Sequence, residues 1–254
     1  MNYFVEGLQG SGKSTLVRKL SEKHPECKAV MEGDYSPVEL AWCAWMNEEQ
    51  YAQVLREWNG LSDQITTKSY KEDDHWIVCY TKVRSADPEF YRQLESHEIY
   101  NGRTTFEQYR DIVLTRYQNW NTEGNIFECS LLQNGVEDMI LYRDMPDEAI
   151  LDFYKDVRSA LDGKEYEILY IETPDIEKNL DTVRKERTDE NGNEVWYTLL
   201  MGYFNSSPHA MKHSLKGTEG LLKHLKHRQE LELRICREVF SDRLTVLKSK
   251  EYDL

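Results

Sequence analysis

A glycine-dense segment carries the residues best suited to hold a phosphate. In "FVEGLQGSGKSTLVRKL", residues 4–20, a short apolar run leads into Gly7-x-x-x-x-Gly12-Lys13-Ser14. Glycines let backbone N–H groups approach phosphate oxygens, the lysine adds a positive charge, and the serine hydroxyl can ligate magnesium. The pattern predicts a nucleotide-binding loop that opens a helix, whose N-terminus also favours an anion. The predicted binding residues are Gly7, Gly10, Ser11, Gly12, Lys13, Ser14 and Thr15.

Carboxylates that follow apolar runs could complete the chemistry of this loop. Glu128 closes such a run in "NIFECS", and we predict that it holds magnesium together with Ser14. Glu32 and Asp34, in "VMEGDYSPVELAW", are both eligible as the base for an acceptor hydroxyl. Glu172 competes for the metal, but the Thr-Pro that follows it indicates a structural strand end.

Arg184 and Arg187 lie three residues apart, just before the Asn-Gly turn signal in "TDENGNEVW". On a helix this spacing puts both guanidinium groups on one face, where they suit the binding of a transferring phosphoryl group. Surface pairing with Glu186 or Asp189 is the alternative. Lys13, Glu32, Asp34, Arg184 and Arg187 are the predicted catalytic residues.

A histidine-rich segment, "SPHAMKHSLKGTEGLLKHLKHRQ", raises a zinc hypothesis. His209-x3-His213 and His224-x2-His227 have suitable spacing, but no cysteine or closely spaced acid completes either pair. Lysines and arginines surround every histidine, which favours a mostly solvated helix face. Arg228, from the same segment, is a weaker candidate for contact with the donor phosphates.

Short apolar runs alternate with helical patterns along the chain, which is typical of a parallel sheet covered on both faces. The predicted strands are residues 3–6, 27–31, 125–128, 166–172 and 244–247. The predicted helices are residues 13–23, 38–58, 88–97, 104–120, 146–161, 175–185 and 217–240. The sequence therefore predicts a three-layer α/β fold.

"EGLQGSGKST" and "YEILYIETPDIEKNLDTVRKER", residues 166–187, resemble the thymidylate kinase and deoxynucleoside kinase group of P-loop proteins. The resemblance implies a P-loop NTPase fold in one domain, 1–254, with a parallel five-stranded sheet in the order 2-3-1-4-5. It also implies ATP and Mg²⁺ as cofactors, a helical acceptor-binding excursion at 33–124 and a lid at 184–205. These kinases carry an arginine after the strand-end acid, whereas this chain has Glu128-Cys129-Ser130.

The excursion is rich in aromatic residues, most of which we expect to pack, while one or two line an acceptor pocket. They are Trp42, Trp45, Tyr51, Trp58, Trp76, Tyr109, Tyr117 and Trp120. Arg103 and Arg110 are candidates for polar contacts there.

The net charge of −14 argues against a nucleic-acid partner. Five widely spaced cysteines without C-x-x-C favour buried reduced thiols. No leader or transmembrane run is evident, so we expect a cytoplasmic protein without a membrane partner, and homodimerisation is left open.

The expected function is ATP- and Mg²⁺-dependent transfer of the γ-phosphoryl group to a small-molecule acceptor, such as a nucleoside, a nucleotide or a similar hydroxyl compound. Two alternatives stay open. One is a hydrolytic NTPase switch, although the chain contains no Asn-Lys-x-Asp motif for guanine. The other is a nucleotide-binding protein without turnover, which the missing arginine beside Glu128 supports.

Overall fold

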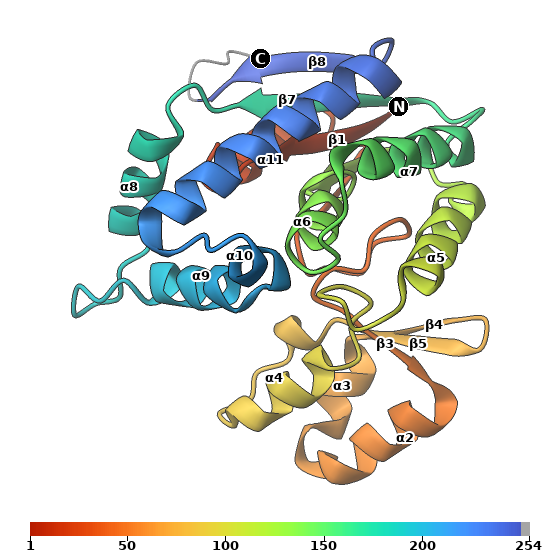
Figure 1. Ribbon diagram of the computed structural model, residues 1–254. Helices are drawn as coiled ribbons and strands as arrows, with labels where there is room; N and C mark the ends of the chain where they lie inside the picture. The colour runs from red at the N-terminus through yellow and green to blue at the C-terminus, as the bar shows by residue number, and fades with distance from the viewer. Residues whose placement is uncertain (250–254) are drawn as a thin grey trace. The chain divides into compact units, whose positions relative to one another are not determined.

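The computed structural model describes residues 1–249, which form two compact units (Figure 1). The first unit combines Met1–Ala29 with the chain from Asn121 onward, and the second is Val30–Trp120. The second unit spans nearly the same residues as the predicted excursion. The backbone N–H of Lys28 donates to the carbonyl of Gly124 at 2.7 Å, so the chain leaves and re-enters the first unit at neighbouring positions.

The first unit is built on a five-stranded sheet in the order β2-β6-β1-β7-β8. β1 pairs in parallel with β6 and β7, and β7 pairs in parallel with β8. The strands are β1 (Asn2–Gly7), β2 (Lys28–Val30), β6 (Asn125–Glu128), β7 (Tyr166–Glu172) and β8 (Leu244–Lys248). The predicted α/β class with a parallel sheet is confirmed.

The strand order in the numbering of the whole chain differs from the predicted 2-3-1-4-5. The difference is one of numbering. Three strands that were not predicted, β3, β4 and β5, come between β2 and β6 along the chain and form a sheet of their own. The prediction numbered only the strands that it had found.

Helices flank the sheet because its central strands are apolar on both faces. Phe4, Val5, Ile126 and Phe127 are all 0% exposed, and consecutive residues of a strand point to opposite faces. The helices of this unit are α1 (Lys13–Lys23), α6 (Gln133–Leu141), α7 (Asp147–Ala160), α8 (Ile176–Glu186), α9 (Val195–Ser206), α10 (Pro208–Lys212) and α11 (Gly217–Val239). Within residues 1–249, no helix has both the length and the apolar character needed to cross a bilayer.

The second unit contains an antiparallel sheet in the order β3-β5-β4. Ala44, Met46, Ile65, Val78 and Phe90, each fully buried, form part of its core. Its strands are β3 (Ala44–Asn47), β4 (Ser69–Glu72) and β5 (His75–Val78), and its α-helices are α2 (Glu48–Glu57), α3 (Ser62–Thr67), α4 (Pro88–Glu95) and α5 (Phe106–Asn119). Two short 3₁₀ helices, Asn59–Leu61 and Tyr80–Lys82, complete it.

The predicted helix over residues 38–58 is wrong in its first half. A turn at Leu40–Cys43 and a left-handed backbone at Trp42 (φ 62°) precede β3. Burial then alternates along β3, with Ala44 and Met46 buried and their neighbours less so, which is the period of a strand. The helix starts only at Glu48, where Asn47 forms a capping box with Gln50.

Helix α6 was also missed, for a different reason. Eight of its nine residues are buried, including Glu137 and Asp138, so it has no polar face and no apolar stripe to detect. The other predicted helices agree with the structure to within a few residues.

All five cysteines carry free thiols in the described structure. Four of them, Cys43, Cys79, Cys129 and Cys236, are buried, and Cys27 is partly exposed. The expected burial of the thiols is thus found for four of the five cysteines.

Candidate phosphate-binding site

The loop between β1 and α1 is built around glycines whose backbone angles other residues rarely adopt. Gly7, Gly10 and Gly12 have φ values of 138°, 76° and 105°. A Cβ atom on Gly7 would lie 2.6 Å from the carbonyl oxygen of Ile171, and one on Gly10 would lie 2.0 Å from Cγ2 of Val183. The loop can therefore keep this path only with glycine at these positions.

Lys13 begins α1 and folds back over the loop. Its Nζ donates to the carbonyl oxygens of Gly7 and Leu8, both at 2.8 Å, and the residue is only 6% exposed. Within the described chain, the first turn of α1 has no acidic residue and Gly12 provides no side-chain cap. The positive end of the helix dipole is thus left to act on an anion.

Ser14 and Glu128, the two predicted metal ligands, are in direct contact. The Ser14 hydroxyl donates to Oε1 of Glu128 at 2.5 Å. This contact follows from the fold, because β1 and β6 are adjacent parallel strands and the loop and Glu128 both lie at their carboxyl ends. Ser14 is exposed and Glu128 is 7% exposed.

The remaining predicted loop residues differ in exposure. Ser11 is fully buried, its backbone carbonyl accepts a hydrogen bond from the Ser249 hydroxyl at 2.9 Å, and its own Oγ has no partner within the described residues. Thr15 is exposed on the first turn of α1.

Cys129 follows Glu128 at the position where the kinase resemblance would place an arginine. It is 1% exposed, has a left-handed backbone (φ 59°) and donates its N–H to the Val5 carbonyl at 3.1 Å. A buried thiol adds no positive charge here.

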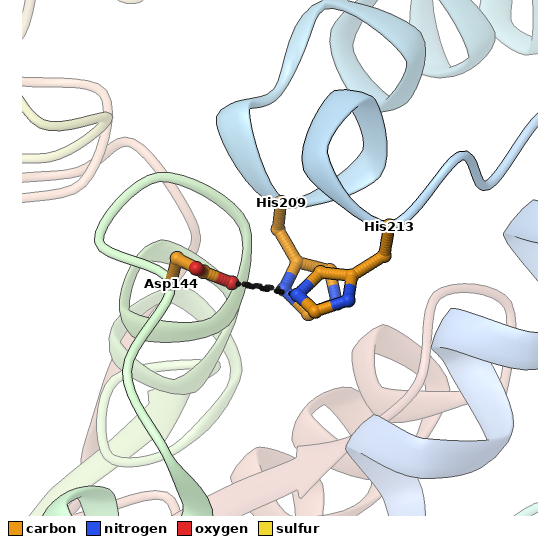
Figure 2. A group of neighbouring side chains, drawn as sticks. All are labelled: Asp144, His209 and His213. Atoms are coloured by element: carbon orange, nitrogen blue, oxygen red, sulfur yellow. Dashed lines mark hydrogen bonds and ion pairs between the residues drawn. The ribbon is translucent and has the colours of Figure 1, made fainter.

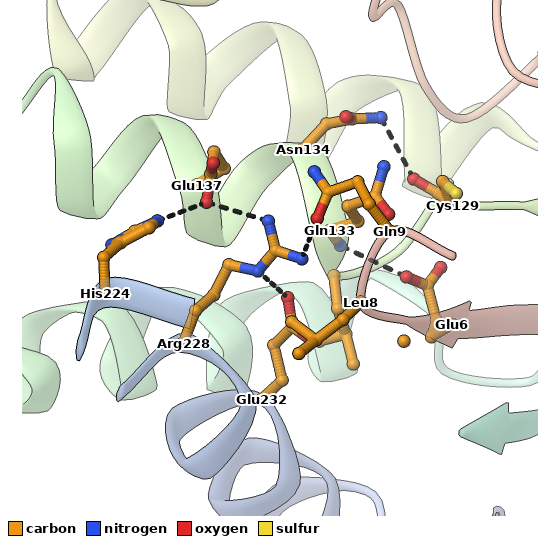
Figure 3. A network of polar contacts seen from close by, with 12 residues as sticks. Glu6, Leu8, Gln9, Cys129, Gln133, Asn134, Glu137, His224, Arg228 and Glu232 are labelled. Carbon is orange, nitrogen blue, oxygen red and sulfur yellow. Dashed lines mark hydrogen bonds and ion pairs between the residues drawn. The ribbon is translucent and has the colours of Figure 1, made fainter. Parts of the chain in front are cut away.

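A buried ionic network supports the loop from α11 and α6 (Figure 3). Arg228, whose side chain is 0% exposed, donates from Nη2 to Oε1 of Gln9 and from Nη1 to Oε2 of Glu137, both at 2.8 Å. Its Nε forms an ion pair with Oε1 of Glu232 at 3.2 Å, and the other oxygen of Glu232, Oε2, accepts a hydrogen bond from the Tyr170 hydroxyl at 2.7 Å. We call Arg228, Glu137 and Glu232 the buried set.

The pKa values of the two carboxylates in the buried set are shifted by burial and by the charges around them. Burial raises the pKa of Glu137, but the charges and hydrogen bonds of Arg228 and His224 outweigh it and lower this pKa to about 2. The pKa of Glu232 is raised, mainly by burial. Glu137 and Glu232 hold the Arg228 guanidinium in place, and the guanidinium in turn positions Gln9 of the loop.

The predicted solvated helix face is wrong for this part of α11. The His224 side chain is 0% exposed and contacts Oε2 of Glu137 at 2.8 Å. The lysines and arginines nearby in sequence suggested solvent, but they lie on other sides of the helix from His224 and Arg228. The prediction of phosphate contact by Arg228 is not supported, because two carboxylates and Gln9 occupy its guanidinium.

Glu6 is a site residue that the sequence analysis missed. It is the penultimate residue of β1, is 0% exposed and accepts hydrogen bonds from the backbone N–H groups of Leu131 and Gln133 at 2.7 and 3.1 Å. Burial raises the pKa of Glu6 to about 7, against the lowering effect of these N–H groups. Its place before the first glycine was the available signal.

The predicted lid is anchored to the loop through α8. Nδ2 of Asn179 donates to the carbonyl of Gln9 at 2.9 Å, and Val183 packs at Gly10. Arg184 pairs with Glu194 at 2.8 Å and lies 4.1 Å from the ring centre of Tyr197. Arg187, at the C-cap, lies 4.8 Å from the ring centre of Trp196. We call Arg184 and Arg187 the lid set.

Glu32 and Asp34 both belong to the second unit and have partners within it. Oε1 of Glu32 accepts from Nε1 of Trp42 at 2.9 Å, and Asp34 pairs with Lys82 at 3.0 Å. Asp34 also accepts from the N–H of Met31 at 3.1 Å, which closes a turn. The geometry within this unit leaves both carboxylates eligible.

Most aromatic residues of the second unit pack, as predicted. Tyr51 stacks on Trp76 with ring centres 4.2 Å apart, and Tyr109, Tyr117 and Trp120 are buried. Trp42 differs, because it is 46% exposed.

The two arginines predicted to make polar contacts in this unit are paired with acids, and a third arginine is the buried one. Arg103 pairs with Glu95 and Glu98, and Arg110 lies near Asp111. The sequence analysis missed Arg116, which is 6% exposed and donates to Glu72 and to the Ser36 carbonyl. The Tyr35 hydroxyl also donates to Glu72, at 2.5 Å.

The first unit is thus an α/β unit with a parallel sheet, a glycine loop between β1 and α1, and a serine–glutamate contact at the adjacent strand end. No protein-family model matches the chain, and no curated protein matches it.

Proposed function

We propose that the chain is an ATP- and Mg²⁺-dependent phosphotransferase that moves the γ-phosphoryl group to a small-molecule acceptor. The contact between the Ser14 hydroxyl and Glu128 carries this proposal. It brings a hydroxyl and a carboxylate together beside a glycine loop and Lys13, which is the combination that holds a nucleotide–magnesium complex in P-loop proteins. The resemblance to the thymidylate kinase and deoxynucleoside kinase group supports the same function.

The residues of the loop suit the binding of both nucleotide and metal. The backbone N–H groups of residues 10–15 and the Lys13 ammonium would hold the phosphates. Ser14 and Glu128 offer only oxygen ligands, which Mg²⁺ prefers, and when bound the ion neutralises charge on the phosphates. Lys13 would exchange the carbonyls of Gly7 and Leu8 for phosphate oxygens.

The lid set would act on the transferring group. α8 contacts the loop at Gln9 and Gly10, so a change in the loop on nucleotide binding would shift the helix that carries Arg184. Arg184 and Arg187 keep partly or fully exposed guanidinium groups, which can be redirected to phosphate oxygens at the cost of a solvent-screened ion pair.

The acceptor is expected to bind to the second unit, in the excursion, with Glu32 or Asp34 as the base. Trp42 is the exposed aromatic residue next to Glu32 and is suited to contact an organic acceptor.

The test is ATP turnover with and without candidate acceptors. Purified protein with ATP and Mg²⁺ should hydrolyse ATP slowly, and the true acceptor from a panel of nucleosides, nucleotides and aminoglycoside-like compounds should stimulate turnover and carry the phosphate in mass spectra. Vigorous acceptor-free hydrolysis to inorganic phosphate would instead indicate the hydrolytic switch.

Lys13→Ala should lower this turnover by roughly 10²- to 10³-fold, because a charge aimed at the phosphates is lost. Arg18→Ala is the matched control, since Arg18 is an exposed cation on the same helix. Thermal unfolding should be similar for both variants. Wild-type turnover by Lys13→Ala would show that this loop is not the phosphate site.

A further inference from the structure

Asp144, His209 and His213 form a compact cluster away from the phosphate-binding loop in sequence (Figure 2). Asp144 lies between α6 and α7, His209 lies in α10, and His213 is the C-cap of that helix. One potential ligand atom from each residue lies within 4.8 Å of the other two. Asp144 is the acid that the two histidines lacked in the sequence, 65 residues away from His209.

The individual distances show that the three groups face one another. Nδ1 of His209 lies 2.6 Å from Oδ1 of Asp144, and Nε2 of His213 lies 3.2 Å from the same oxygen. The ring centres of the two histidines are 4.3 Å apart. Histidines four residues apart lie on one side of a helical turn, so the backbone of α10 presents both rings to Asp144.

We propose that Asp144, His209 and His213 bind a zinc ion. Two imidazole nitrogens and one carboxylate oxygen suit a borderline divalent metal, whereas Mg²⁺ and Ca²⁺ prefer oxygen ligands alone. Three protein ligands leave the fourth tetrahedral position to water. Zinc bonds of about 2.0–2.2 Å place ligand atoms roughly 3.4 Å apart, so the Asp144 carboxylate would move away from His209 by less than an ångström.

Lys212 is the competing cation at this site, because its Nζ pairs with Oδ2 of Asp144. The two histidines approach the other oxygen, Oδ1, so the metal and the lysine would use different oxygens of the same carboxylate. His213 is 48% exposed in its side chain and Asp144 is 19% exposed, which gives the ion a route from solvent.

A metal here would anchor the segment that directly follows the predicted lid, residues 184–205. α10 follows α9 directly, and α9 already contacts the residue after α6, because the Tyr142 hydroxyl donates to the Tyr203 carbonyl at 3.4 Å. Zinc would add a second link, from α10 to Asp144. Residues 195–213 would then be held at their C-terminal end while residues 184–194 stay able to move.

The test is zinc titration of the untagged protein after dialysis against a chelator, followed by calorimetry. We expect one zinc per chain with a micromolar or tighter dissociation constant, and Co²⁺ in its place should give the absorption bands of a tetrahedral site. Millimolar Mg²⁺ should not displace the zinc. Absence of saturable zinc binding, or octahedral cobalt spectra that Mg²⁺ abolishes, would overturn the proposal.

The variants His213→Ala and Asp144→Asn should weaken zinc binding by at least about 100-fold, since the first removes a ligand and the second replaces an anionic oxygen ligand by a neutral one. His227→Ala is the matched control, because His227 also contacts a carboxylate, Asp147 at 2.9 Å, and its side chain is 38% exposed against 48% for His213. His213 is half exposed, so its loss should leave the fold intact by circular dichroism. Equal weakening of zinc binding in His227→Ala, or no weakening in His213→Ala, would also overturn the zinc proposal.

Hydrogen exchange supplies an independent readout. Zinc should slow amide exchange in residues 195–213 of the wild type and leave it unchanged in His213→Ala. This result does not depend on ATP or on turnover.

Discussion

Gln9 is held from two sides by two very different parts of the first unit. Its side-chain oxygen accepts a hydrogen bond from Arg228 of the buried set, and its backbone oxygen accepts one from Asn179 of α8, the helix that carries the lid set. Arg228 is 0% exposed and shares two carboxylates, whereas Arg184 is 27% exposed and pairs with acids at the surface. Both sets place arginine close to the same loop, so burial distinguishes a charge that stabilises the fold from one that is available to a ligand.

Breaking the buried set should give the largest effect. Arg228→Ala leaves Glu137 and Glu232 without their guanidinium partner, and loss of one partner of a buried ion pair costs about 3–5 kcal/mol. Urea unfolding should show this loss. The control is Arg234→Ala on the same helix, whose pairs with Glu148 and Glu238 are exposed, and its unfolding midpoint should hardly change. Equal midpoints for the two variants would contradict the assigned role of Arg228.

Acid should weaken the buried set in a defined pH window. The pKa of Glu137 is about 2 in the folded protein, against 4.5 for a free glutamate, so its ionised form stabilises the fold above about pH 4.5 and that stability is lost as the pH falls toward 2. The shift corresponds to on the order of 3 kcal/mol. The difference in unfolding free energy between wild type and Glu137→Gln should therefore narrow as the pH falls from 5 to 3, and a constant difference would refute this origin.

Glu128 is a third case, because it is buried like Glu137 and Glu232 but is proposed to bind magnesium rather than to stabilise the fold. Glu128→Gln should weaken binding of ATP with Mg²⁺ by roughly 10- to 100-fold and binding of ATP without metal much less, because only the metal complex needs the charge. Glu172→Gln, at the end of β7, is the matched control in the same calorimetric titration. Equal losses with and without Mg²⁺ would move the metal role to another carboxylate.

The lid set should give a smaller effect that is confined to turnover. Arg184→Ala should lower kcat about 10-fold, with little change in thermal stability, since its ion pair is largely exposed to solvent. Lys185→Ala, the next residue and an exposed cation, should behave as wild type. Arg184→Ala that loses stability rather than kcat would place Arg184 with the buried set.

The sequence predicted the sheet and the loop because their signals are local. Continuous apolar runs mark the strands, and the glycines, Lys13 and Ser14 lie within eight residues of one another. Glu128 was predicted from its place at a strand end, which the parallel sheet brings to the loop.

The missed features depend on contacts between distant segments. Asp144 completes the histidine pair only because the connection after α6 lies against α10. His224 was predicted on a solvated face and Arg228 at the donor phosphates, whereas α6 supplies the buried Glu137 that both contact. In the second unit, Trp42 and Trp45 have the spacing of an apolar helix face, which led to the wrong helix prediction, while burial along β3 follows a period of two.

The hydrogen bond between Lys28 and Gly124 bears on how such a chain can diversify. The 91-residue second unit, Val30–Trp120, lies between two backbone positions that a hydrogen bond joins: Lys28 in β2 and Gly124, the residue before β6. Recombination that exchanged this segment for another with similarly spaced ends would not change the register of β1, β6 or β7. Val30–Trp120 could therefore be replaced as a whole while the glycine loop of the first unit is inherited unaltered.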